Sequence, residues 1–440
     1  MKHAYLLYTG YGKTKLMLDA IVNAKEKPRV LLISTKMIVE SSWQQQIDEW
    51  YPGQISYEFI TGTVKPKDRM TLINKQPDIL ALSVDMIDWY IKNTVPVKSV
   101  RYLKHGPKNI YDHDEIVKRF DLLIIDESSL FKNSQSQRFK AIKIWAHKIE
   151  HVFILSATPT PKDIEDLWSQ IYLLDGGARL GRSITKFRED YAIAIPMSNG
   201  YNRYQYTQQA VNAVLDKVKD IVTSVPEPPT ALFPEPVIIK TMLNPDDATK
   251  KLLKEFRQNY IVDLPNREQL IAFSKNQLMV KINQIASGQV YTDTTTVKIN
   301  DIKFKALLHF INKTPTPILV PYTYVFDLEL LQTIPGARVL KTKKDFEDWN
   351  NDLIKVGIIS PFAAAHGLNL QFSSCQDIIW FSPIWDTEKW IQTNARVCRR
   401  GQTRQVNIRV LILRGSFDDE VFSLCQDKFA AQYNNLHKLK

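Results

Sequence analysis

Residues 4–14 read AYLLYTGYGKT, an apolar run followed by a glycine turn and by Lys13-Thr14 at the start of a helical pattern. A strand, a glycine turn and a helix opened by Lys-Thr form an arrangement that cradles phosphates, because backbone N–H groups can approach them. In it Lys13 would reach the β and γ oxygens, and Thr14 would bind Mg²⁺. The general pattern has a glycine where Leu7 stands, so an incidental glycine turn is the alternative.

Short apolar runs alternate with helix-length segments along the rest of the chain. Such runs, bounded by turn residues, are typical of buried parallel strands in an α/β sheet. The chain has 440 residues, more than the roughly 250 to 300 at which one core stops growing, so we expect two domains. The runs are residues 4–8, 30–34, 79–83, 122–125 and 152–155 in the first part, and 318–320, 356–360, 377–381 and 406–413 in the second.

A proline-rich stretch separates the two sets of strands. Residues 224–236 (SVPEPPTALFPEP) contain five prolines, which neither a helix nor a central strand tolerates. We therefore predict a first domain over residues 1–223, a connection over 224–236 and a second domain over 237–440. A helical pattern over residues 245–260 begins the second domain.

Composition and charge exclude several classes of protein. Hydrophobic residues make up 44% of the chain, which is typical of a folded globular protein rather than a disordered one. The three cysteines form no Cys-x-x-Cys pair, and no run approaches the roughly 18 apolar residues of a membrane span. We therefore expect no disulfide framework, no zinc site, no membrane partner and a cytoplasmic location. A net charge of +11 is compatible with a polyanionic partner.

Two adjacent carboxylates follow the strand at residues 122–125, within the segment FDLLIIDESSLFKN. Ligands of open α/β sheets bind at the carboxyl ends of strands, where Asp126 would hold Mg²⁺ and Glu127 would polarise the attacking water. A surface loop with two acids is the alternative. Beyond the next strand, Ser156 and Thr158 of Ser-Ala-Thr-Pro could hydrogen-bond this carboxylate pair and relay the nucleotide state.

A third set of polar residues lies near the end of the chain, where Gln392, Arg396 and Arg399 share one segment. If residues 390–399 are helical, arginines three apart lie on one face and can point at a single phosphate. Such arginines stabilise charge on a transferred γ-phosphoryl group. A basic helix face used for solubility or for DNA phosphates is the alternative.

Together these segments resemble the helicase-like ATPases of superfamily 2, specifically the Swi/Snf-like branch, which includes small phage-encoded DNA helicases. The ending Arg-x-Gly-Gln of the last segment is the most specific match. The matching segments are TGYGKT (9–14, motif I), STKMIVESSWQQQIDEW (34–50, Ia), IIDESSLFKN (124–133, II), LSATPTP (155–161, III), ILVPYTYVFDLELL (318–331, IV), SPFAAAHGLNLQ (360–371, V) and QTNARVCRRGQ (392–402, VI).

The resemblance implies two tandem RecA-like domains of the α/β class, each a mostly parallel sheet flanked by helices, with ATP and Mg²⁺ in the interdomain cleft. It implies catalytic roles for Lys13, Asp126, Glu127, Gln392, Arg396 and Arg399, and coupling roles for Ser156 and Thr158. Thr14 and Asp126 would hold the metal. The nucleotide would be bound by Thr9, Gly10, Tyr11, Gly12, Lys13, Thr14, Lys15 and Gly367.

The sequence departs from the family pattern at two places. Family members carry a segment with an adenine-reading glutamine before motif I, whereas eight residues precede Thr9 here. We therefore expect adenine recognition to be weak or to use stacking by other residues. Motif II reads DESS, so the family's contact from its fourth position to motif III should be missing. The insertions of eukaryotic chromatin remodellers are absent, so we do not expect nucleosome binding.

The family's strand-binding regions place several candidates for contact with nucleic acid, since cations, hydroxyls and aromatic rings bind single strands. The basic insertion at residues 97–108 is either a strand-separating or duplex-gripping element or a solvated loop. Trp43 and Trp50 are seven apart and could instead belong to the core. The candidates are Thr35, Lys36, Trp43, Thr61, Gly62, Thr63, Lys65, His366 and Asn369.

The sequence thus predicts a monomeric, ATP-dependent DNA helicase or translocase that acts on branched or double-stranded DNA in replication, recombination or repair. If the chain is phage-encoded, its location is the host cytoplasm. One alternative is a translocase that remodels protein–DNA complexes without separating strands. A second is a DNA-binding module with a degenerate ATP site, and RNA is a minor alternative substrate.

Overall fold

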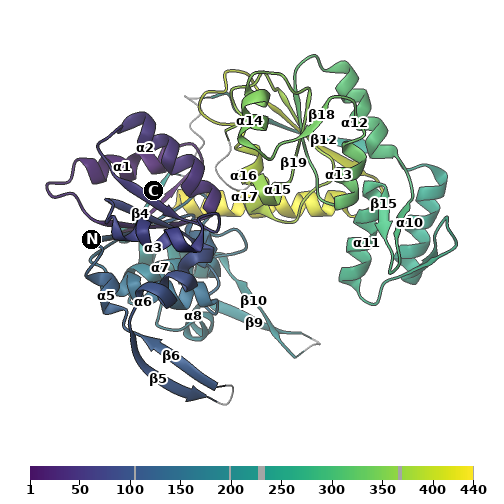
Figure 1. Cartoon of the computed structure of the whole chain (residues 1–440). Helices are drawn as coiled ribbons and strands as arrows, with labels where there is room; N and C mark the ends of the chain where they lie inside the picture. The colour runs from purple at the N-terminus through teal and green to yellow at the C-terminus, as the bar shows by residue number, and fades with distance from the viewer. Residues whose placement is uncertain (104–105, 198–199, 226–232, 365–368, 440) are drawn as a thin grey trace. The chain divides into compact units, whose positions relative to one another are not determined.

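The computed structural model describes residues 1–103, 106–197, 200–225, 233–364 and 369–439 (Figure 1). The chain divides into two compact units: Met1–Glu227 with Ala430–Lys440, and Pro228–Phe429. The division falls inside the proline-rich stretch, most of which lies outside the described residues. The predicted second domain, residues 237–440, differs from the observed second unit at its C-terminal end. There the side chains of Leu436 and Leu439 pack in the core of the first unit.

The first unit is built on a seven-stranded sheet in which every neighbouring pair is parallel. Alternate residues of one central strand belong to different cores: Leu31 and Ile33 face one cluster, and Val30 and Leu32 face another. Both faces of the sheet are therefore covered, as expected for a parallel sheet. The strand order is β11 (Val222–Val225), β1 (Lys2–Leu7), β8 (His151–Ser156), β7 (Leu122–Asp126), β2 (Val30–Ser34), β4 (Ile79–Ser83), β3 (Tyr57–Ile60).

Helices connect these strands in the first unit. In the sheet, β8 and β7 lie between β1 and β2, although both come later along the chain. Parallel strands arranged in this way require crossover connections. The helices are α1 (Lys13–Val22), the π-helix η1 (Ile38–Trp43), α2 (Gln44–Trp50), α3 (Pro66–Asn74), α4 (Ile87–Thr94), α5 (Asp114–Val117), α6 (Gln137–Lys148), α7 (Glu165–Asp175), α8 (Ile184–Tyr191) and α9 (Gln208–Val218), with 3₁₀ turns at Val84–Met86, Ser128–Phe131 and Lys219–Ile221.

The second unit carries a six-stranded sheet that is also parallel throughout. Its strand order is β12 (Val237–Leu243), β21 (Asn407–Leu413), β20 (Asp377–Trp380), β17 (Ile318–Pro321), β19 (Val356–Ile359), β18 (Ala337–Val339). Its helices are α10 (Asp247–Asn259), α11 (Lys275–Ser287), α12 (Ile302–Lys313), α13 (Val325–Leu331), α14 (Lys343–Asn350), α15 (Pro361–Ala364), α16 (Thr387–Asn394) and α17 (Asp418–His437). Two helix-flanked parallel sheets confirm the predicted pair of RecA-like α/β domains.

Four antiparallel hairpins, which the sequence does not predict, complete the described part of the chain. The basic insertion at residues 97–108 lies largely in the hairpin β5 (Val97–Leu103) and β6 (Gly106–Tyr111), so it is not a loop (Figure 1). The others are β9 (Ala192–Pro196) with β10 (Asn202–Tyr206), β13 (Ile261–Asp263) with β14 (Gln269–Ile271), and β15 (Gln289–Tyr291) with β16 (Thr296–Lys298). No described helix is both long enough and apolar enough to cross a membrane.

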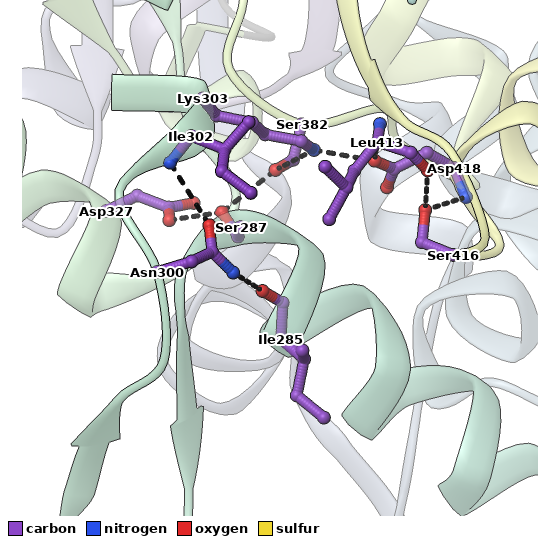
Figure 2. Close-up of polar contacts among 10 residues, drawn as sticks. All are labelled: Ile285, Ser287, Asn300, Ile302, Lys303, Asp327, Ser382, Leu413, Ser416 and Asp418. Atoms are coloured by element: carbon purple, nitrogen blue, oxygen red, sulfur yellow. Dashed lines mark hydrogen bonds and ion pairs between the residues drawn. The ribbon is translucent and has the colours of Figure 1, made fainter. Parts of the chain in front are cut away.

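A buried polar network holds the helices of the second unit to its sheet (Figure 2). Lys303 of α12 pairs with Asp418 at 2.8 Å, and these two side chains are 0% and 1% exposed. Lys303 also donates to Ser382 at 3.2 Å, and Ser382 shares a 2.9 Å hydrogen bond with Ser287. Ser287 in turn donates to Asp327 at 2.5 Å. One cation thus serves a network that contains two carboxylates.

Candidate nucleotide-binding site

The turn between β1 and α1 has the backbone geometry of a phosphate-binding loop. Gly10 and Gly12 have φ of 91° and 76°, a left-handed conformation that favours glycine. Helix α1 begins at Lys13, so the N–H groups of its first turn face the glycine turn. The Lys13 ammonium donates to the carbonyl of Leu7 at 3.0 Å, across the turn. Thr14 is 7% exposed in the first turn of the helix.

The other residues predicted for nucleotide binding differ in their surroundings. Thr9 is partly buried in the turn, and Tyr11 is 36% exposed. Lys15 instead pairs with Asp19 one turn along α1 and donates to the hydroxyl of Tyr51 at 2.7 Å. Its ammonium is therefore engaged with the helix and with the end of α2. Gly367 lies outside the described residues.

Asp126 ends strand β7 with its carboxylate buried. Its Oδ2 accepts a hydrogen bond from the indole Nε1 of Trp43 at 2.8 Å, and its backbone carbonyl accepts one from Ser34 at 2.9 Å. Burial raises the pKa of Asp126, while the Trp43 hydrogen bond and the charge of Lys13 oppose that rise. The carboxylate is thus held in a dry site close enough to Lys13 for their charges to interact.

Glu127 is the point at which motifs II and III meet. Its Oε1 accepts hydrogen bonds from Ser129 at 2.9 Å and from Ser156 at 3.1 Å, and Ser156 accepts one from the backbone N–H of Thr158 at 3.1 Å. The φ of Glu127 is 65°, a strained conformation for a residue other than glycine and one that clusters at functional sites. The fourth residue of DESS therefore reaches motif III through Glu127, which it shares with Ser156.

A glutamine that the sequence analysis missed joins the same two motifs. Gln170 of α7 is fully buried; it accepts from Ser128 at 2.6 Å and donates to the carbonyl of Pro159 at 2.6 Å. A polar residue within the apolar run of α7 was the available signal. The hydroxyl of Thr158 is also buried, and it has no partner among the described residues.

Motif VI lies in the second unit, where α16 ends at Asn394. Arg396 and Arg399 therefore follow the helix in a series of turns, so the condition under which both would share one helical face, a helix over residues 390–399, is not met. Arg396 is 7% exposed, and Arg399 donates from Nη1 to Oδ1 of Asn369 at 2.9 Å. Burial lowers the pKa of the Arg399 guanidinium.

Gln392 lies in the last turn of α16, two residues before its end, and is 5% exposed. Its Nε2 donates to Glu388 at 3.3 Å, while its Oε1 has no partner within the described residues. A buried acceptor without a donor costs free energy, so such an atom calls for an explanation. Within the described part of the chain, the amide oxygen of Gln392 is therefore a buried acceptor without a donor.

Three of the seven predicted nucleic-acid residues of the first unit contact Glu40. Thr61 and Thr63 donate to its Oε1 at 2.6 and 2.9 Å, and Lys36 pairs with Oε2 at 3.9 Å. Thr61 is 0% exposed, so the prediction that it contacts nucleic acid is wrong. Trp43 is also 0% exposed, so of its two interpretations the structure supports membership of the core and not contact with nucleic acid.

The remaining candidates divide by exposure. Thr35 is 7% exposed and accepts from the N–H of Ile38 at 3.4 Å, whereas Gly62, Thr63 and Lys65 are exposed. Asn369 directs its amide oxygen to Arg399, and His366 lies outside the described residues. Among the described candidates of the first unit, the exposed ones are thus these three residues in the turn after β3 and the side chain of Lys36, which is 40% exposed.

A phosphate-binding turn after β1, a carboxylate pair at the end of β7 and a serine at the end of β8, the strand between β1 and β7, define the class of P-loop nucleoside triphosphatases. Comparison with known proteins gives the family. The model of the SNF2-related domain matches residues 8–308, and the chain belongs to this family. Membership of this family supports ATP hydrolysis by the chain.

Among relatives, the chain is 26% identical to protein p41 of Acyrthosiphon pisum secondary endosymbiont phage 1, covering 98% of this chain and 93% of that protein. It is 22% identical to the uncharacterized ATP-dependent helicase YqhH of Bacillus subtilis strain 168, covering 95% and 73%. It is 23% identical to the SWI/SNF-related matrix-associated actin-dependent regulator of chromatin subfamily A-like protein 1 of Xenopus laevis, but spans only 40% of it. The Sulfolobus solfataricus SWI2/SNF2 ATPase core in complex with dsDNA aligns with a TM-score of 0.41 at 18% identity, covering 98% and 88%.

Proposed function

We propose that the chain is a Mg²⁺-dependent ATPase that couples hydrolysis to movement on DNA, as a helicase or translocase. The observation that carries this proposal is the convergence of Ser129 and Ser156 on Glu127, beside Asp126 and the turn of Lys13. A carboxylate whose orientation is fixed by two hydroxyls is suited to orienting and polarising a water molecule. The link from Glu127 to Ser156 carries the state of that carboxylate to motif III.

The residues at the turn fit magnesium. The hydroxyl of Thr14 and the carboxylate of Asp126 are oxygen ligands, which this cation prefers, and it commonly takes one or two carboxylates together with substrate phosphates. No described group of three or more His, Cys, Asp or Glu residues could form an all-protein metal site, which agrees with that mode. When bound, Mg²⁺ would neutralise charge on the phosphates. Thr14 and Asp126 would position it, and Lys13 would bind the phosphate oxygens.

Motif VI would supply the remaining cations. Arg396 and Arg399 would contact the γ-phosphate. The amide oxygen of Gln392, which has no partner among the residues that the structure describes, would accept from the attacking water. Asn369 would hold Arg399 in position through their 2.9 Å hydrogen bond. An arginine supplied to the γ-phosphate is worth about 10³ to 10⁵ in rate where its effect is known.

DNA is the polymer along which the protein is proposed to move. Two observations support it: the Bacillus relative is named as an ATP-dependent helicase, and the chain carries a net charge of +11. Gly62, Thr63 and Lys65 are exposed in the turn after β3 and would contact a strand. We propose a cytoplasmic location, that of the host if the chain is phage-encoded, and branched or double-stranded DNA as substrate.

The test is ATP hydrolysis with single-stranded, duplex, forked and four-way DNA and with RNA, each over a salt series. We expect stimulation by DNA that falls as salt rises, because phosphate contacts release counterions. The Lys13→Ala variant should bind DNA and lose hydrolysis; if it hydrolyses ATP at the wild-type rate, the assignment of the turn is wrong. Absence of hydrolysis by the wild type would favour a DNA-binding module instead.

Strand separation is tested separately with forked DNA and with duplex DNA that carries a bound protein. A helicase opens the fork. A translocase that remodels protein–DNA complexes displaces the protein and leaves the fork paired.

A further inference from the structure

Trp43 lies in the core directly beneath the candidate site. It ends the π-helix η1, which follows β2, and β2 is the strand paired with β7. Its ring belongs to the same core cluster as Met17 and Leu18 of α1, the helix that Lys13 and Thr14 open. One fully buried side chain therefore contributes both to the packing under the phosphate-binding helix and to the hydrogen bonding of Asp126.

The hydrogen bond from Trp43 to Asp126 has a particular character. An indole N–H donates but cannot accept, and it carries no charge, so it fixes a carboxylate without neutralising it. The bond of 2.8 Å engages Oδ2, while Ser34 holds the backbone carbonyl of the same residue at 2.9 Å. Both the strand end and the carboxylate plane of Asp126 are thereby held. π-Helical turns of this kind occur frequently at functional sites.

Orientation matters here because magnesium demands near-ideal octahedral geometry. Groups that hydrogen-bond a metal ligand commonly change metal affinity by about 10- to 100-fold when they are removed. Side chains that merely fill the core affect stability without that selectivity.

We propose that Trp43 is a positioning residue, which holds the Asp126 carboxylate in the orientation needed for the magnesium of Mg·ATP. This inference rests on the proposed function, because it assigns Asp126 to the metal. It replaces the sequence-based expectation that Trp43 contacts nucleic acid.

The chain provides a matched control. Trp145 is also fully buried in the first unit, and its Nε1 donates at 2.9 Å to Nδ1 of His113, away from the nucleotide turn. The Trp43→Phe and Trp145→Phe variants each remove an indole N–H and part of a ring from the same unit. Both should lower Tm, but only the first should alter the response to magnesium.

The experiment measures equilibrium binding of ADP by calorimetry, with and without Mg²⁺, together with the Mg²⁺ concentration that half-saturates hydrolysis. We expect Trp43→Phe to weaken Mg·ADP about tenfold, to raise the half-saturating Mg²⁺ similarly, and to leave metal-free ADP unchanged. We expect Trp145→Phe to bind both forms as the wild type does. Wild-type binding of Mg·ADP by Trp43→Phe, or equal weakening of both forms, would overturn the proposal.

A second substitution guards against a Trp43→Phe protein that does not fold. Benzothienylalanine at position 43 retains the bicyclic ring and replaces only the N–H by sulfur. It should reproduce the magnesium-specific loss, and unchanged Mg·ADP binding would again overturn the proposal. If the wild type neither binds Mg·ADP nor hydrolyses ATP, the proposed function itself fails, a result distinct from failure of the variants alone.

Discussion

Ser156 donates its hydroxyl to Oε1 of Glu127 across 3.1 Å, joining the end of β8 to the carboxylate that follows β7. These strands are neighbours in the sheet but are separated by a helix along the chain. The bond therefore brings motif III into the proposed catalytic centre. It acts together with Ser129, which donates to the same oxygen.

Replacement of Ser156 by Ala should lower the kcat for ATP by about 10- to 100-fold, because a hydrogen bond to a charged acceptor contributes about 1.5 to 3 kcal/mol. KM should change little, since Glu127 is assigned to the attacking water. Steady-state hydrolysis with saturating duplex DNA measures both. Ser83→Ala is the control, because the Ser83 hydroxyl is buried at the end of β4 and has no partner among the described residues. Equal effects of the two substitutions would contradict the role given to Ser156.

The adjacent residues Asp418 and Asp419 of α17 form ion pairs in very different surroundings. Lys303 and Asp418 are fully buried, whereas Lys240 and Asp419 are 43% and 51% exposed at 2.7 Å. Lys303→Met should destabilise the second unit by about 3 to 5 kcal/mol, since it leaves a buried carboxylate without its cation. Lys240→Met should lower the stability of the second unit by less than about 1 kcal/mol. Backbone hydrogen exchange in α12 and α17 measures both, and similar losses would contradict this account of the network.

Asp327 makes the stability of the second unit depend on pH. Burial raises the pKa of its carboxyl from 3.8 to about 6, despite hydrogen bonds from Ser287 and the N–H of Tyr324 and the charge of Lys303. Between pH 3.8 and about pH 6, the Asp327 carboxyl keeps its proton in the folded state and has lost it in the unfolded state. The unfolding free energy should therefore fall as pH rises through this window and stay lower above it, by about 3 kcal/mol.

The Asp327→Asn variant should lack this contribution. Hydrogen exchange of α12 and α13 from pH 4 to pH 7, corrected for intrinsic exchange rates, gives the local opening free energy of each protein. The local opening free energy of the variant minus that of the wild type should increase as pH rises. A difference that does not vary with pH would show that Asp327 keeps its ordinary pKa.

The sequence alone predicts those elements whose buried residues form a continuous apolar run. The strands β2 and β4 have the predicted bounds, since all five residues of each are buried. The phosphate-binding turn was also predictable, because Gly10 and Gly12 are the residues that its positive φ angles require. The hairpin β9–β10 was not predictable, because most of its residues are exposed and β9 shows no alternation of apolar and polar positions.

The errors at the site have local causes. Trp43 and Trp50 are seven residues apart, which on one continuous α-helix would give them one environment. The change from the π-helix η1 to α2 separates them, so that Trp43 is buried while Trp50 is 37% exposed. Arg396 and Arg399 leave the helical face because α16 stops at Asn394. Neither a π turn nor an early helix end has a strong signature in a single sequence.

The most direct test of the central claim is ATP turnover by the Glu127→Gln protein in the presence of duplex DNA, with Mg·ATP binding measured in parallel. The substitution keeps the shape of the side chain and removes its basicity, so binding should resemble that of the wild type. Turnover should fall at least about 100-fold, the lower end of what a general base contributes. Turnover at the wild-type rate would contradict the assignment of Glu127, and with it the nucleotide site on which the proposed function depends.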